Sequence, residues 1–252
     1  MHLIFLTLAT LATLQADGEI TPAPTAPLPY EAETDHVWNW VIDGSLIGST
    51  RVRIRPSEKV ASEWILDARL RFSRAGRTID SRSLTTFSGT SRRLTHYRRE
   101  MRTGLTNSKL QSTVVTARFG TETTEVSVQK SSSPEIFDRN FTTGENPTIL
   151  DSQCFEHWLL LAPNFPAERK GKIQVLVPTL QQSLELELER EVIEGEGADR
   201  LHRWNISHPT FEALIWVDEK GAVERYLQGD LDIQRQRVSP KPDPTEEAGE
   251  GG

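Results

Sequence analysis

The chain has 252 residues, of which 36% are hydrophobic, and it carries a net charge of −7 at pH 7. This acidic balance argues against nucleic acid as a partner, because nucleic acids attract basic surfaces. Cys154 is the only cysteine, so a monomer forms no internal disulfide. A hydrophobic core, to which six Trp and nine Phe contribute, has to provide the stability.

Residues 1–16 resemble a secretory signal peptide. The apolar run LIFLTLATLATL at positions 3–14 is followed by Ala16, a small residue suited to cleavage, and then by a polar residue. The run is shorter than the ~20 residues that span a membrane, although its N-terminal side carries His2 and neither Lys nor Arg. We therefore expect export to the periplasm or the extracellular space, cleavage after Ala16, and no transmembrane span in the mature chain.

The rest of the chain divides into three parts. Residues 17–34 contain four prolines between Pro22 and Pro29, which is typical of an extended, solvated linker. Residues 238–252 are rich in Pro, Gly and Glu, so we expect a disordered acidic tail. Residues 35–237 remain, and their number suits a single all-β domain.

Two stretches, residues 36–130 and 172–237, alternate between apolar and polar side chains and carry turn signals every eight to twelve residues. Val52 and Ile54, for example, face one side of a strand, and the arginines between them face the other. Turn chemistry such as Asp43-Gly44 brings each strand back antiparallel to the last. The pattern predicts an all-β antiparallel meander that forms an open half-barrel of about 11–12 strands.

One apolar helix is expected between the two stretches, at residues 152–162. Asp151 suits the N-cap position, and Leu150 and Phe155 suit a hydrophobic staple. Pro163 ends the helix. Because apolar side chains cover most of its circumference, we expect the helix to plug the concave face of the half-barrel.

The second half, residues 149–237, contains the segments CFEHWLLLAPNF, KGKIQVLVP and ALIWVDEKGAVERYL. It resembles exported bacterial proteins of unknown function grouped around the LolA/LolB-like lipoprotein-carrier superfamily. The matching features are a Lys170-Gly171 turn after a short helix, a strand that ends at Pro178, and a closing hairpin with Val217-Asp218 and Gly221. The resemblance implies an open barrel of about eleven strands, plugged by helices, that encloses acyl chains in its best-known members. The chain lacks the lipid-modified cysteine of the membrane-anchored carrier, so an anchored acceptor role is not implied.

Cys154 and His157 are three residues apart and lie on one face of the expected helix, as a nucleophile and its base would. Asp151 is the nearest group that would orient the histidine. A cysteine in an apolar helix is more commonly a small core residue. We therefore expect no catalytic residue and no enzymatic activity, and a small acyl-transfer or hydrolytic enzyme using Cys154 and His157 stays open as an alternative.

No cofactor and no metal are expected. His202 and His208 are six residues apart and have no carboxylate pair beside them in the sequence. Four glutamates alternate along one strand, an arrangement more typical of a solvated outer face than of an acid and base pair in a cleft. They are Glu185, Glu187, Glu189 and Glu191.

Positive charge is concentrated in residues 51–102, which hold fourteen Arg or Lys against five Asp or Glu. Alternation places several of these arginines on one outer face, as a basic surface stripe. The stripe consists of Arg51, Arg53, Arg55, Arg69 and Arg71. Such a stripe suits contact with anionic lipid headgroups or an acidic envelope polymer, and equally suits cross-strand pairing with acidic residues in water.

Together these features predict an exported cell-envelope protein that acts as a monomer and binds a lipid or other apolar ligand, such as an acyl chain, in its concave face. The expected ligand-binding residues are Trp38, Trp40, Phe155, Trp158, Leu161 and Trp216. The alternative is a structural or protein-interaction module with a packed interior and an envelope protein as partner. A ligand-binding concave face and a packed interior require the same alternation of apolar and polar residues, so the sequence leaves both functions open.

Overall fold

The computed structural model describes residues 27–105, 110–194 and 200–236. The expected signal peptide, the first part of the expected linker and the acidic tail lie outside these residues. The described chain is all-β, with one antiparallel sheet of fourteen strands in the order β8-β7-β6-β5-β4-β3-β2-β1-β14-β13-β12-β11-β10-β9. The predicted half-barrel is confirmed, with more strands than the eleven or twelve expected.

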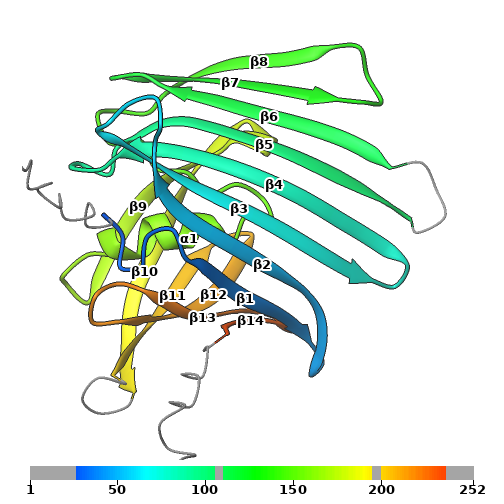
Figure 1. The fold of residues 1–252 in the computed structure, drawn as a ribbon. Coiled ribbons are helices and arrows are strands. Elements are labelled where there is room, and N and C mark those ends of the chain that lie inside the picture. Colours follow the sequence, from blue (N-terminus) through cyan, green and yellow to red (C-terminus); the bar gives the residue numbers. More distant parts are fainter. Residues whose placement is uncertain (1–26, 106–109, 195–199, 237–252) are drawn as a thin grey trace, which may run out of the picture.

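The N-terminal half of the sheet runs from β1 to β8 as a continuous meander (Figure 1). Its strands are β1 (Asp35–Ile42), β2 (Ser45–Pro56), β3 (Glu63–Arg74), β4 (Arg77–Ser88), β5 (Leu94–Leu105), β6 (Gln111–Phe119), β7 (Thr123–Lys130) and β8 (Ile136–Thr142). The C-terminal half consists of β9 (Lys170–Val177), β10 (Gln182–Glu194), β11 (Leu201–His208), β12 (Phe211–Asp218), β13 (Val223–Gln228) and β14 (Leu231–Arg235).

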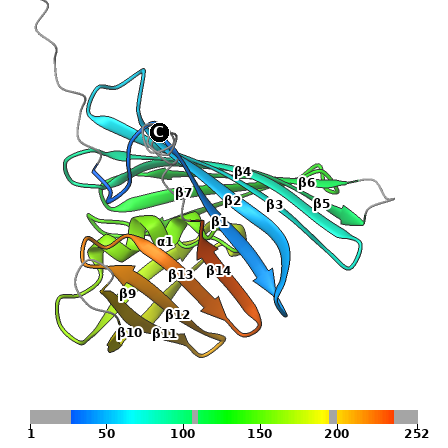
Figure 2. The ribbon, with the colours of Figure 1, turned by 60° about the horizontal axis from the view of Figure 1, so that its bottom comes forward.

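The two halves join where β1 pairs with β14, with Trp40 opposite Ile233. From this seam the sheet folds over on itself, and the helix α1 (Glu156–Leu161) lies between the two halves (Figure 2). Strands β8 and β9 remain at opposite ends of the strand order, so the barrel is open. Gln181 connects the two ends, since its side chain donates to the carbonyl oxygen of Phe137 on β8 at 2.7 Å.

Each of the tight turns between β1 and β2 and between β3 and β4 has two consecutive residues at positive φ. Asp43 and Gly44 have φ of 50° and 73°, and Ala75 and Gly76 have 49° and 74°. Two consecutive positive φ values twist a two-residue turn in the direction that strand twist favours. The turn before β13 is closed by Gly221, with φ of 86°, whose N–H donates to the carbonyl of Asp218. These hairpins are those that the sequence predicted.

The expected strands and the expected helix bounds have to be corrected. Strand β8 lies in a segment where no strand was expected, because most of its side chains are exposed and it shows no alternation. The helix is shorter than residues 152–162, and its N-cap is Phe155, with no side-chain cap. A 3-10 turn, Ala162–Asn164, follows the helix directly. Pro163 lies within this turn, so the helical backbone extends one residue beyond it. Asp151 makes other contacts, described below.

The described end of the expected linker packs against the sheet. Leu28 and Tyr30 are buried, and the Tyr30 hydroxyl accepts the backbone N–H of Val223 on β13 at 2.7 Å. Burial raises the pKa of this hydroxyl. This part of residues 17–34 is therefore a component of the domain and not a solvated spacer.

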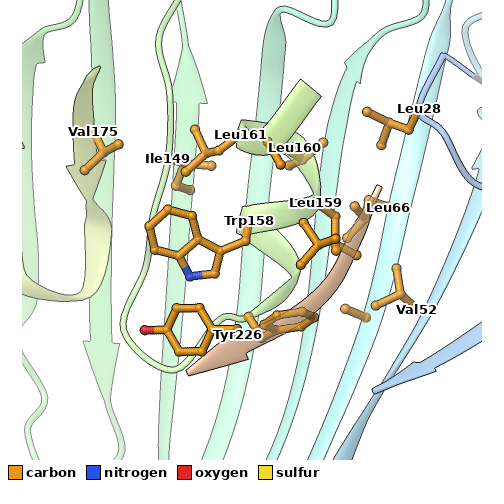
Figure 3. Packing of buried hydrophobic residues seen from close by; sticks show 14 of the residues in the cluster. Leu28, Val52, Leu66, Ile149, Trp158, Leu159, Leu160, Leu161, Val175 and Tyr226 are labelled. Atoms are coloured by element: carbon orange, nitrogen blue, oxygen red, sulfur yellow. The ribbon is translucent and has the colours of Figure 1, made fainter. Parts of the chain in front are cut away.

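The core lies between the two halves and centres on α1 (Figure 3). Leu159 and Leu161 are almost fully enclosed, and Trp158 packs against Tyr226 of β13 with their ring centroids 5.8 Å apart. All six residues of α1 are buried, including Glu156 and His157. A helix enclosed on every side is what its nearly continuous apolar circumference predicts. None of the described helices is long and apolar enough to cross a membrane.

Candidate functional site

An apolar pocket of about 290 Å³ opens beside α1, on the concave side of the sheet. Its walls come from the segment that precedes and begins α1, from the start of β10, and from β1 and β12–β14. The lining residues are Trp40, Leu150, Asp151, Ser152, Gln153, Cys154, Phe155, Trp158, Val177, Leu180, Gln182, Leu184, Thr210, Phe211, Tyr226, Gln228, Leu231 and Ile233.

Aromatic rings form one side of this pocket. Trp40 extends from β1, and its indole N–H donates to the Thr50 hydroxyl at 2.9 Å, so the polar edge of the ring is satisfied inside the protein. Phe155 and Trp158 lie with their ring centroids 6.2 Å and 5.8 Å from that of Tyr226. Aromatic and aliphatic walls with a few polar side chains are typical of sites for small apolar ligands.

Three of the six expected ligand-binding residues line the pocket: Trp40, Phe155 and Trp158. Trp38 and Leu161 are buried in the core, and neither is part of the pocket wall. The Trp38 indole N–H instead donates to the carbonyl of Val223 at 3.2 Å.

The expected position of Trp216 has to be corrected. Its neighbours Ile215 and Val217 belong to the core, whereas Trp216 lies on the opposite face, in register with Arg225. The Arg225 guanidinium lies 4.9 Å from the centroid of the indole and covers it. Trp216 is thus buried on the outer face by a cation–π contact, which sequence alternation alone does not distinguish from burial on the inner face.

A buried polar cluster lies next to the pocket. Its central ion pair joins Arg99 of β5 to Asp151, with Nη1 and Oδ2 3.5 Å apart and the two side chains 1% and 0% exposed. Arg99 also donates to the Ser81 hydroxyl at 2.9 Å and to the carbonyl of Ser152 at 2.6 Å. The Tyr97 hydroxyl donates to Asp151 at 2.7 Å.

Asp151 ties the pocket segment to the chain after β9. Its carboxylate accepts the N–H of Ser152 at 3.0 Å, and the N–H and hydroxyl of Thr179 at 2.9 and 2.7 Å. With Tyr97 and Arg99 these bonds satisfy both carboxylate oxygens. Asp151 therefore links the sheet to the pocket wall. It does not act as the expected N-cap, because the helix begins later than predicted.

The geometry around Cys154 and His157 does not match an activated thiol. His157 Nδ1 accepts the backbone N–H of Asp151 at 2.8 Å, and the Cys154 sulfur lies 3.4 Å from the Tyr97 hydroxyl. Cys154 is 3% exposed. Burial raises the pKa of the thiol and lowers the pKa of the imidazole, so the sulfur stays protonated and the ring neutral.

Cys154, Glu156 and His157 place their ligand atoms within 4.8 Å of one another. This set does not fit a metal ion. Nδ1 of His157 accepts a backbone proton, so the neutral ring carries its own proton on Nε2 and offers no free lone pair. Glu156 is already the acceptor for the Ser83 hydroxyl, and the thiol is protonated.

The glutamate row on β10 lies on the outer face, as expected. Glu185 pairs with Lys172 at 2.6 Å and Glu189 with Lys170 at 2.9 Å. Glu187 and Glu191 have basic partners as well, at 3.5 and 3.3 Å.

The basic stripe lies on the outer face of β2 and β3. Arg51 and Arg53 contact Asp35 at 3.7 and 2.8 Å, and Arg55 contacts Glu58 at 3.8 Å. Arg69 and Arg71 form no ion pair within the described part of the chain. Cross-strand pairing with acidic residues therefore accounts for part of the stripe only.

Reasoning from the sequence missed Arg99, which lies in a run of arginines that looked solvent-facing. The available signal was its spacing of two from Tyr97, which puts both side chains on one face of β5. On the adjacent strand the inward-facing residues Ser81, Ser83 and Thr85 are also polar. Buried charged groups need hydrogen-bond partners, so a row of small polar residues that faces an apolar helix indicates a buried charge nearby.

These features define an open, β-barrel-like protein with an internal helical plug and an apolar pocket beside it. No family model matches the chain, and no curated protein matches it. Among solved structures it is similar to a β-barrel-like protein of the domain of unknown function DUF1849 from Brucella abortus. The two share 10% sequence identity at a TM-score of 0.54, over 81% of this chain and 95% of that chain. The similarity is one of fold.

Proposed function

We propose that this protein binds an apolar ligand of the acyl-chain class in the pocket beside α1, as an exported protein of the cell envelope. The pocket carries the proposal: about 290 Å³ of space, walled by Trp40, Phe155 and Trp158, lies on the concave side of the sheet, beside the core cluster around α1. Ligand pockets usually measure about 300–1,000 Å³, so this one, at the lower limit of that range, suits a segment of one acyl chain.

The chemistry of the wall favours a hydrocarbon over a polar metabolite. Asp151 is the charged cluster member that lines the pocket, and its carboxylate is occupied by Arg99, Tyr97 and Thr179. Arg99 is not part of the pocket wall; it bonds Asp151, Ser81 and the carbonyl of Ser152, and its Nη2 has no hydrogen-bond partner among the described residues. The Tyr226 hydroxyl, a polar group at the wall, donates to Gln228 at 2.7 Å. An apolar ligand gains about 25 cal/mol per Å² that it buries, without needing these groups.

A binding experiment tests this proposal. Delipidated protein is titrated with a fluorescent fatty acid, and the same titration is made with Leu231→Arg. Leu231 is a half-buried pocket residue, and the arginine stem fills the pocket while its charged end reaches water. We expect saturable binding that weakens at least tenfold in this variant. Leu110→Arg, at an exposed leucine outside the pocket, is the control and should bind like the wild type. Equal binding by all three proteins, or none by the wild type, contradicts the proposal.

A further inference from the structure

The outer face of β2–β5 carries more arginines than acidic residues. Its exposed or half-exposed basic residues are Arg51, Arg53, Arg55, Arg69, Arg71, Arg82, Arg98 and Arg102. Four acidic residues share the face, namely Glu63, Asp67, Asp80 and Glu100. The face is therefore strongly basic, although the chain as a whole carries −7.

Three of these arginines lie directly opposite one another across adjacent strands. Arg51 is paired in register with Arg69, and Arg69 with Arg82. Side chains in such positions have their Cβ atoms about 4.5–5.5 Å apart, and like charges there destabilise the sheet. Arg82 has Asp67 as a partner at 2.6 Å, whereas Arg69, in the middle of the row, forms no ion pair in the described chain. An external anion bound at Arg69 would relieve the repulsion between the arginines of this row.

The arginines also surround a surface hollow. It measures about 390 Å³ and is lined by Asp35, Ser49, Arg51, Arg53, Asp67, Arg69 and Arg71. Asp35 and Asp67 are engaged by Arg53 at 2.8 Å and Arg82 at 2.6 Å. Among the described residues, Arg69 and Arg71 are the arginines of the hollow that form no ion pair. The basic residues of this region are nearly all arginine, since Lys59, in a loop, is the only lysine between residues 51 and 102. Arginine is the residue that binds phosphate oxygens in bidentate fashion.

We propose that this face docks on a membrane surface of anionic phospholipids, with a headgroup phosphate in the hollow at Arg69 and Arg71. A free small anion would occupy the hollow alone, whereas Arg102 lies outside it on the same face and also forms no ion pair in the described chain. A planar array of phosphates engages the hollow and the outlying arginines together. The strands are 12 residues long, so the face extends about 40 Å at roughly 3.3 Å per residue. The proposal is independent of the pocket, which lies on the other face of the sheet.

Vesicle sedimentation tests it. The protein is mixed with vesicles of phosphatidylglycerol and phosphatidylcholine, and with vesicles of phosphatidylcholine alone. We expect binding to the first only, reversed by high salt. Each basic residue near an anionic leaflet strengthens binding about fivefold, so Arg69→Gln/Arg71→Gln should weaken it by about 25-fold. Both side chains are exposed, so the fold should be retained, which a thermal melt checks.

The control is Lys130→Gln/Lys220→Gln, which removes the same charge from exposed positions elsewhere and should bind as the wild type does. Soluble poly-glutamate and inorganic phosphate are tested in parallel. Absence of vesicle binding, equal binding by both double variants, or binding to poly-glutamate or phosphate without binding to vesicles overturns the proposal. Fatty-acid binding measured on Arg69→Gln/Arg71→Gln should be unchanged, so the pocket and the docking face are judged separately.

Discussion

Arg99 and Asp151 form an ion pair inside the barrel, with their charged atoms 3.5 Å apart and both side chains enclosed. One comes from the middle of β5, and the other stands five residues before α1. The pair therefore attaches the segment that forms the pocket wall to the sheet across the interior. Removal of one partner leaves a buried charge without compensation, which is far more costly than loss of a surface pair.

We predict that Arg99→Met lowers the free energy of unfolding by about 3–5 kcal/mol. The surface pair Arg82 and Asp67 provides the comparison, and Arg82→Met should cost at most about 1 kcal/mol because the arginine is half exposed. Urea unfolding followed by tryptophan fluorescence measures both. Losses of similar size in the two variants would show that the buried pair does not hold the interior together.

Stability should fall as the pH decreases below about 6.5, the usual pKa of histidine. Burial lowers the pKa of His157, so the unfolded chain takes up a proton in this range and the folded chain does not. The stabilisation is fully present above the unfolded pKa and is lost as the pH falls towards the lower folded pKa.

His157→Asn tests this assignment, because the asparagine oxygen can accept the Asp151 N–H in place of Nδ1. The unfolding free energy of this variant should vary less between pH 7 and pH 5 than that of the wild type. Identical pH profiles for the two proteins would assign the acid sensitivity to other groups.

The fold was largely predictable from the sequence, because its signals are local. Turns such as Asp43-Gly44 fix where each strand returns, and alternation such as Val52 and Ile54 fixes which side is buried. Strand β8 was missed because it is an edge strand with exposed Ile136 and Phe137, and only Phe141 packs against the core, so its sequence shows no alternation. Pairing with β7 holds it in the sheet.

The site was predictable only in part, because it depends on contacts between distant segments. Trp40, Phe155 and Trp158 were identified from their faces, and they do meet at the pocket. The role of Asp151 was assigned from local capping rules, whereas its partners Arg99 and Thr179 lie 52 and 28 residues away. Rules based on neighbouring residues in the sequence do not predict contacts between residues so far apart.

Cys154 should react slowly with a thiol reagent in the folded protein. It is 3% exposed, and burial raises its pKa, so little thiolate is available. We expect alkylation by iodoacetamide to be at least about a hundredfold slower in native protein than in urea, as mass spectrometry of timed samples would measure. Fast native alkylation, with loss of a measurable activity, would favour the alternative of an enzyme that uses Cys154 and His157.

Gly48 on β2 should not tolerate a side chain. A Cβ at this position would overlap the carbonyl oxygen of Arg71 and lie 2.8 Å from the Cα of Phe72, both backbone atoms of β3. Because a backbone cannot rotate away as a side chain can, Gly48→Ala should cost about 1–3 kcal/mol. The neighbouring substitution Ser49→Ala is the control in the same urea titration and should cost much less. Equal costs would show that the two strands can separate at this point.

The central claim is that an acyl chain occupies the space beside Trp40 and Trp158. The most direct measurement is the quenching of tryptophan fluorescence by a fatty acid that carries bromine in mid-chain, since bromine quenches only on close approach. We predict saturable quenching that is largely lost in Trp40→Phe/Trp158→Phe and retained in Trp216→Phe, whose ring lies on the outer face. Absence of quenching in the wild type, or quenching that the double variant leaves unchanged, would contradict the account.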